Sequence, residues 1–197
     1  MTVPIEQRNI GVYLEQLASK APTPGGGSVA GLVAALAMSL GRMVVSLSES
    51  TSELKEADAA LKAAGIFSLA GSDADERAYG GYIAASSLPR STPEEKAFRR
   101  LQMQASLLDS AEVPLGLAEH VQAMKPILQR TSELGNPHVV SDARIGLILA
   151  DAAIAACLIN VRINLPMIKD PAAVALFRNR LLKFDDEQSS SEGESTV

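Results

Sequence analysis

Residues 28–48, SVAGLVAALAMSLGRMVVSLS, decide the fold class, because they read as one long helix with apolar residues on nearly all of its sides. Apolar side chains recur every three or four positions, and Ser28 is a favourable N-cap residue. One face carries Leu32, Ala35, Leu36, Ser39 and Met43. Such a helix needs more than one neighbour to bury its sides. We therefore expect a helical bundle around it.

The rest of the chain predicts more helices and gives almost no evidence for strands. A short first helix follows from the helical spacing of Ile10, Tyr13, Leu14 and Leu17. Thr92, Pro93 and Glu95 begin a long helix that reaches about Arg130, and Pro114 and Pro126 should kink or divide it. Further helices are expected over about 52–64, 73–87, 141–165 and 171–183. The fold class is all-α, an up-and-down bundle of long helices.

Composition sets the domain organisation and excludes several classes of protein. The 197 residues fit one domain, residues 1–184, followed by a polar tail, residues 185–197, that we expect to be disordered. A net charge of -5 without a basic cluster argues against nucleic acid as a partner. The apolar runs near residues 29–45 and 145–167 contain charged or amide residues, so we expect no membrane span. The N-terminus resembles no secretory signal, which makes a cytoplasmic location the expectation.

The loop APTPGGGS, residues 21–28, is the most informative candidate for a binding site. Pro22 and Pro24 stiffen it, and Gly25, Gly26 and Gly27 let the main chain come close to a ligand. The free N–H groups at the following helix start can bind an anion or a carbonyl group. The loop lacks the ending of a P-loop. From the residues alone, a ligand-binding loop and an ordinary turn between helices both remain open.

A second polar loop, GNPHVVSDA at residues 135–143, also leads into a helix. Ser141 is a good N-cap and Asp142 suits the positive end of a helix dipole, so capping and a catalytic carboxylate are both open interpretations. His138, beside Asp142, is a candidate acid/base group. Further along, Asn160 and Asn164 share one helix face, where they bond a neighbouring helix or a ligand.

Acidic residues Asp73, Asp75 and Glu76 precede Tyr79, which lies one turn after Asp75. Acidic residues in a first helical turn commonly complement the helix dipole. The single cysteine, Cys157, lies in an apolar stretch and excludes an intramolecular disulfide and a multi-cysteine metal site. We expect no metal, and the absence of a nucleophile motif points to acid/base catalysis or to no catalysis.

Several of these segments together resemble one family of enzymes. They are PTPGGGSVAG at residues 22–31, Asp75 to Tyr79 with Leu88-Pro89, Val113-Pro114-Leu115, and GNPHVVSDARIGLILADAAIAACLINVRINL at residues 135–165. In this order they resemble the cyclodeaminase/cyclohydrolase family of folate one-carbon metabolism, over about residues 10 to 165. The family includes the C-terminal domain of formiminotransferase-cyclodeaminase and free-standing methenyltetrahydrofolate cyclohydrolases.

The resemblance implies an all-helical homodimer that acts on a tetrahydrofolate derivative, with no other cofactor. It also implies a folate cleft lined by the glycine loop and the start of the Ser141 helix. Asp142 is then the first acid/base candidate, with Asp75 and His138 beside it. The folate would lie against the loop and several polar side chains: Pro24, Gly25, Gly26, Gly27, Ser28, Tyr79, Asn136, Ser141, Asn160 and Asn164.

One departure from the family keeps two other functions open. Relatives commonly carry a basic segment after the second helix, whereas residues 46–52 read SLSESTS, which removes cations that could hold a folate glutamate tail. An enzyme for another amidine or formimino substrate would explain this change. A non-catalytic homodimeric binding protein would also explain it. Retention of the glycine loop with Asp75, Asp142 and Asn160 favours the folate enzyme.

Overall fold

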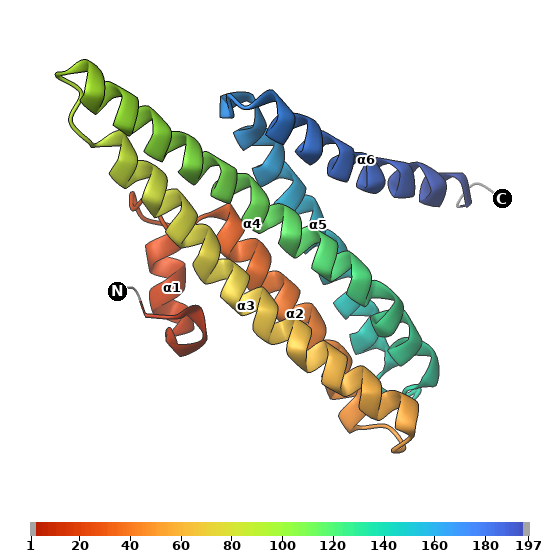
Figure 1. Ribbon diagram of the computed structural model, residues 1–197. Helices are drawn as coiled ribbons and strands as arrows, with labels where there is room; N and C mark the ends of the chain where they lie inside the picture. The colour runs from red at the N-terminus through yellow and green to blue at the C-terminus, as the bar shows by residue number, and fades with distance from the viewer. Residues whose placement is uncertain (1–2, 195–197) are drawn as a thin grey trace.

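The computed structural model describes residues 3–194, with side chains described up to residue 185, and this part of the chain is helical without a strand. The order is η1 (Ile5–Gln7), α1 (Ile10–Leu17), α2 (Gly26–Ser46), α3 (Ser52–Ser86), α4 (Pro93–Leu134), α5 (Val140–Asn164), η2 (Leu165–Met167) and α6 (Pro171–Glu194). The predicted all-α class is confirmed. Figure 1 shows the four long helices α2 to α5 side by side, with α6 crossing at one edge.

The bundle forms because each long helix is packed against two neighbours. α2 contacts α3 and α5, and α4 contacts the same two helices from the other side. Small residues on α2 allow this close approach: a Cβ atom at Gly31 would lie 2.6 Å from the carbonyl oxygen of Ser68 on α3. Larger side chains, including Met38, Leu115 and Leu128, are fully buried between the helices. α6 adds Phe177, Leu181 and Phe184 to this core.

Several helices differ from their predicted extents or starting residues. α3 is continuous over 35 residues, so the expected gap between helices at 52–64 and 73–87 is wrong. α4 runs uninterrupted past Pro114 and Pro126, so these prolines do not divide it. α2 begins at Gly26 with Gly25 as N-cap, and α5 begins at Val140, so neither Ser28 nor Ser141 is an N-cap residue. α6 continues into the segment from residue 185 whose composition predicts disorder; residues 195–197 lie outside the described residues.

The two most apolar helices bear on the expectation that no segment spans a membrane, which stays a prediction. By length and composition alone, α2 and the segment Val140–Met167 are long and apolar enough to cross a membrane. Half of the tested window of α2 and 39% of that of Val140–Met167 are buried inside the structure. Core helices of soluble proteins pass the same test, so this is weak evidence for a membrane span.

Candidate functional site

A small cleft of about 210 Å³ lies where the glycine loop meets α3, α4 and α5. We call it the glycine-loop cleft. Its lining residues come from four separate segments of the sequence: Pro22, Thr23, Gly25, Gly26, Gly27, Asp75, Tyr79, Ser110, Asn160 and Asn164. The fold therefore brings together residues that are more than 130 positions apart in the sequence. Several predicted site residues meet here and leave space for a ligand.

The carboxylate of Asp75 lies directly against the first turn of α2. Any Cβ atom at Gly27 would collide with that carboxylate, which explains why this position is a glycine. The backbone N–H of Ser28 donates a hydrogen bond to Asp75. The start of α2 therefore holds a carboxylate from α3 with one of its otherwise unpaired N–H groups.

Burial makes Asp75 an unusual acid. Desolvation raises its pKa from 3.8 to about 6, the hydrogen bond from Ser28 opposes this rise, and the nearby charge of Glu76 adds to it. A carboxyl group with a pKa near 6 can both accept and donate a proton close to neutral pH. Among perturbed groups in a cleft, this is the behaviour expected of a catalytic residue.

Behind the cleft, Ser28 belongs to a buried polar network that fixes the start of α2. Its hydroxyl donates to Glu76 at 2.9 Å and lies 3.1 Å from the hydroxyl of Tyr13. Arg8 forms an ion pair with Glu76 at 2.7 Å, and both side chains are more than 90% buried. The Ser28 side chain is fully buried, so it positions the loop from behind.

Pro114 explains how one cleft amide is positioned. Because proline has no N–H, the carbonyl of Ser110, four residues earlier in α4, loses its usual helical donor. The Asn164 side chain donates to this carbonyl at 3.0 Å, and also to the carbonyl of Asn160 at 3.0 Å. The free carbonyl of Ser110 on α4 thus accepts a hydrogen bond from Asn164 on α5, which joins the two helices at the cleft.

Asn160 and Tyr79 complete the polar and aromatic lining. The Asn160 side chain donates to the carbonyl of Ala156 at 3.0 Å and contacts Gly26. The side-chain oxygens of Asn160 and Asn164 accept no hydrogen bond from the described residues. Tyr79 is 43% exposed and stacks on Tyr82, with ring centroids 6.5 Å apart. The cleft therefore presents amide acceptors beside an aromatic face.

The comparison with known proteins identifies the family. Residues 9–183 match the formiminotransferase-cyclodeaminase family, which is most of the chain. The chain belongs to the formiminotransferase-cyclodeaminase family. The resemblance found in the sequence is thereby confirmed.

Relatives in this family differ in length and in name. The formimidoyltransferase-cyclodeaminase of Sus scrofa is 32% identical over 86% of this chain, but the chain spans only about a third of that protein. The methenyltetrahydrofolate cyclohydrolase of Methylorubrum extorquens is 33% identical over 83% of this chain and 82% of its own length. The crystal structure of formiminotetrahydrofolate cyclodeaminase from Thermotoga maritima matches with a TM-score of 0.78 and 25% identity, covering 96% of this chain and 92% of that one.

Within this family member, the second predicted group of site residues lies at the other end of the bundle. Asp142 is in the first turn of α5 and Asn160 near its last turn, which puts them about 27 Å apart at ~1.5 Å rise per residue. Asn136 donates to the carbonyl of Leu47, and its backbone N–H donates to Ser48. His138 is exposed and lies in the same loop, and Ser141 is exposed in the first turn of α5. Their contact with the ligand of the glycine-loop cleft remains a prediction.

Some residues of the cleft and its support were not predicted from the sequence. Thr23 and Ser110 line the cleft, and Arg8 and Glu76 support it from behind. Pro114 was the available indication for Ser110, since a proline inside a helix leaves the carbonyl four residues earlier without its donor. Of the predicted residues in the loop, Pro24 is buried and is not among the residues that line the cleft.

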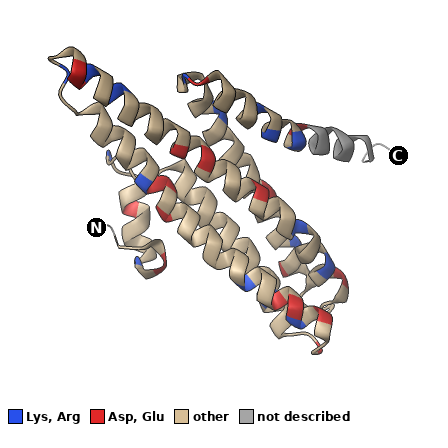
Figure 2. Ribbon diagram, viewed as in Figure 1, with Lys and Arg blue, Asp and Glu red and all other residues tan. Residues whose placement is uncertain are grey.

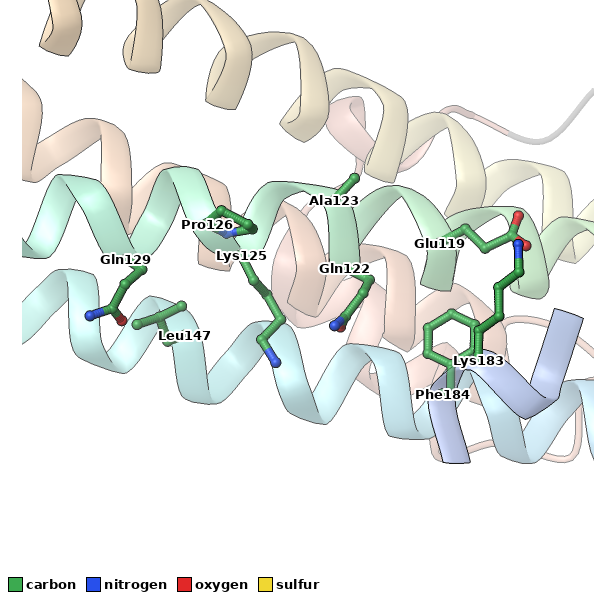
Figure 3. A pocket seen from close by; sticks show the side chains of 9 residues that line it. All are labelled: Glu119, Gln122, Ala123, Lys125, Pro126, Gln129, Leu147, Lys183 and Phe184. Atoms are coloured by element: carbon green, nitrogen blue, oxygen red, sulfur yellow. The ribbon is translucent and has the colours of Figure 1, made fainter. Parts of the chain in front are cut away.

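A larger groove lies elsewhere and is bordered by structural ion pairs. It measures about 870 Å³ between α4, α5 and α6, with Gln122, Lys125, Lys183 and Phe184 among its lining residues (Figure 3). Lys125 pairs with Asp151 at 2.7 Å, and Glu119 pairs with Arg180 at 2.8 Å. The hydrogen bond from Arg180 holds the pKa of Glu119 below its usual value. The first pair joins α4 to α5 and the second joins α4 to α6, so these charges have a structural role and the glycine-loop cleft is the better candidate for chemistry.

Proposed function

We propose that this chain is a folate one-carbon enzyme that acts on the carbon between N5 and N10 of tetrahydrofolate. The observation that carries the proposal is Asp75, a carboxyl group with a raised pKa that is held by the glycine loop inside a cleft. Support comes from relatives named as cyclodeaminases and as a cyclohydrolase. The cyclohydrolase relative has nearly the same extent as this chain, so one domain of this size suffices for such chemistry.

Both reactions in the family need the same kind of site. In the cyclodeaminase reaction, N10 of 5-formiminotetrahydrofolate bonds to the formimino carbon, the bond from that carbon to the amino nitrogen breaks, and ammonia leaves. In the cyclohydrolase reaction, water bonds to the methenyl carbon, the bond to N5 breaks, and 10-formyltetrahydrofolate forms. Each passes through a tetrahedral carbon and moves protons to and from nitrogen or oxygen, so each needs a positioned acid/base group.

We assign the acid/base role to Asp75, because Asp142 lies at the opposite end of the bundle. Asp75 would take a proton from the attacking N10 or water and return it to the leaving nitrogen. The amide oxygens of Asn160 and Asn164 would accept hydrogen bonds from N–H groups of the pterin. Tyr79 offers a ring for stacking, and the glycine loop lets the substrate approach the start of α2.

The test is absorbance spectroscopy with two substrates, because the methenyl group is a chromophore. Loss of signal from 5,10-methenyltetrahydrofolate above the buffer rate reports the cyclohydrolase, and gain of signal from 5-formiminotetrahydrofolate with ammonia release reports the cyclodeaminase. Turnover should rise with pH through about 6 as Asp75 ionises. Asp75→Asn should lower kcat by about 10² to 10⁴, the usual contribution of general acid/base catalysis.

A matched control is Asp58→Asn, which removes an acidic residue of α3 that pairs with Arg42 outside the cleft. This variant should keep wild-type turnover. Two results would contradict the proposal: wild-type protein that is folded but inactive on both substrates, or Asp75→Asn with undiminished turnover.

We also propose that the chain functions as a homodimer through one apolar face. On α5, exposed apolar side chains recur at helical spacing: Ile145, Ile148, Ala152, Ala155, Ile159 and Ile163. The charged residues Arg144, Asp151 and Arg162 are exposed at their edge. Leu36 and Met43 extend this face onto the neighbouring helix α2, which Figure 2 draws almost entirely without charge. Exposed apolar patches of this extent are typical of protein interfaces, and two-fold homodimers are the most common assemblies.

A further inference from the structure

A second groove lies close to the glycine-loop cleft, where α3, the N-terminal half of α4 and η2 meet. It measures about 450 Å³, and its walls include the apolar side chains of Tyr82, Met103 and Leu107. Three cations line it: Arg99, Arg100 and Lys169. No carboxylate of the described residues is among the groups that line it. We call it the cationic groove.

The cationic groove follows the glycine-loop cleft along the same helices. Tyr82 of the groove stacks on Tyr79 of the cleft. On α4, Leu107 of the groove lies one turn before Ser110 of the cleft. At the end of α5, Asn164 of the cleft precedes Pro166 and Met167 of the groove. On three sides, then, the lining continues from one space into the other.

The loop that carries Lys169 is fixed against α4 by a single glutamine. The Gln104 side chain donates to the carbonyl of Met167 at 3.0 Å and accepts from the backbone N–H of Lys169 at 2.7 Å. The neighbouring Asp170 carboxylate accepts from the N–H of Ala172 and caps α6. Lys169 is thus anchored at the groove through its backbone.

The charges in this groove are not neutralised within the described protein. Arg100 and Lys169 form no ion pair with described residues, and Arg99 donates its Nε–H to the carbonyl of Ser86 at 3.0 Å. Elsewhere in the bundle, Arg180, Arg130 and Lys125 are each paired with carboxylates. Three cations lining one groove without a carboxylate are suited to an anionic ligand.

We propose that the cationic groove binds the carboxylate end of an extended substrate whose reacting end lies in the glycine-loop cleft. For the folate substrate proposed above, on which this inference rests, that end is the glutamate of the aminobenzoyl-glutamate arm. The seven residues from Asp75 to Tyr82 put the entrance of the groove about 10 Å along α3 from the acid/base group. Tyr82 and Met103 would contact the aminobenzoyl ring, and Arg100 and Lys169 the carboxylates.

The experiment compares two substrates that differ only in the glutamate: 5,10-methenyltetrahydrofolate and 5,10-methenyltetrahydropteroate, or the matching 5-formimino pair. The variant is Arg100→Ala/Lys169→Ala, which keeps Arg99 because that residue braces the end of α3. We expect KM for the glutamate-bearing substrate to rise about tenfold, as for the loss of two exposed charge pairs. KM for the pteroate and kcat for both substrates should stay unchanged.

The charge-matched control is Lys62→Ala/Arg178→Ala, which removes one lysine and one arginine from exposed positions of α3 and α6 outside the groove. This control should keep the wild-type preference for the glutamate-bearing substrate. If the groove variant also keeps that preference while turnover is intact, the subsite is wrong and the proposed function stands.

Binding of p-aminobenzoyl-glutamate, measured by calorimetry, separates the two proposals when turnover is absent. If p-aminobenzoyl-glutamate binds to wild type and binds more weakly to the groove variant, the anionic subsite is supported without the proposed reaction. p-Aminobenzoate, which lacks the glutamate, is the comparison ligand, and its binding should not differ between the two proteins. An absence of both turnover and binding would overturn the subsite together with the proposed function.

Discussion

Asp75 is a carboxyl group in a buried position that disfavours its ionised form. It lies against the glycine at position 27 and receives a hydrogen bond from Ser28, yet burial still raises its pKa to about 6. Such an arrangement lowers the stability of the folded protein at neutral pH, because the ionised form is less favourable in the cleft than in water. Loss of stability at a reactive group is a frequent accompaniment of catalysis.

The loss of stability caused by ionised Asp75 can be measured with the same Asp75→Asn variant. The folded protein holds a proton on Asp75 at pH values between 3.8 and about 6, where the unfolded chain has lost it. The stabilising contribution of the protonated form is therefore complete below about pH 4 and is lost as pH rises through 6. Asparagine cannot ionise, so at pH 7.5 the variant should have a free energy of unfolding up to about 3 kcal/mol above wild type.

Urea denaturation at pH 4, 5.5 and 7.5 checks this expectation. The difference between variant and wild type should grow with pH and be small at pH 4. Asp58→Asn, which breaks an exposed pair with Arg42, should give no gain at pH 7.5. A variant at Asp75 that is no more stable than wild type at pH 7.5 would contradict the assignment of a raised pKa.

At the level of elements, the buried ion pair of Arg8 and Glu76 connects the N-terminal segment to α3. Both side chains are more than 90% buried, so the pair has little access to water, and the Ser28 hydroxyl also donates a hydrogen bond to Glu76. The hydrogen bond with Glu76 raises the pKa of the Arg8 guanidinium above its usual value, so Arg8 stays charged. The segment before α1 is held by this pair and by the bond from the Ile5 N–H to Asp73 at 3.0 Å.

Glu76→Gln should destabilise the protein by about 3 kcal/mol, because a buried guanidinium loses its counter-charge. Glu53→Gln is the control: it breaks the ion pair with Arg130, whose two side chains are about half exposed, and its effect on stability should be much smaller than that of Glu76→Gln. Chemical denaturation at pH 7 measures both. If the two substitutions lowered the free energy of unfolding equally, the burial of the Arg8–Glu76 pair would not explain the effect of Glu76→Gln.

The sequence predicted the type and order of the long helices but not the continuity of α3 and α4. Residues 65–72, GIFSLAGS, contain two glycines and two serines, which favour a break when read locally. In the structure Ser68 donates to the carbonyl of Ala64, and Ser72 donates to the carbonyl of Ser28 on α2. Packing against α2 thus outweighs local propensity. Pro114 is accommodated because Asn164 uses the carbonyl that it frees.

At the scale of the whole molecule, part of the predicted residue set lies together in one cleft, and its function stays a prediction. The glycine loop, Asp75, Tyr79, Asn160 and Asn164 are distant in sequence and line one cleft, as expected from the resemblance. Asp142 does not line it, and the predicted helix from residue 141 to 165 already implied this. A rigid helix of that length separates its ends by about 36 Å at ~1.5 Å per residue. The resemblance identified functional segments, but the distances between them depend on the fold.

The proposed homodimer gives a prediction at this scale. Ile148, 65% exposed on α5, lies within the apolar face, so Ile148→Arg should place charges between the two copies and shift the protein to monomer. Ile66→Arg is the control, because Ile66 is similarly exposed on α3. Sedimentation or light scattering at a fixed concentration measures the mass. A monomeric wild type, or an Ile148→Arg protein that remains a dimer, would contradict this use of the face.

The continuity of α3 has a consequence for selectivity. Because Asp75 and Tyr82 lie on one uninterrupted helix, the separation between the two ends of the proposed substrate site is set by the backbone itself. α3 would then fix the length of substrate that can occupy both ends of the site. A shorter substrate would reach one end and miss the other, whereas one inserted residue between Asp75 and Tyr82 would turn the far end by about 100° around the helix axis. Discrimination by length would need no moving part.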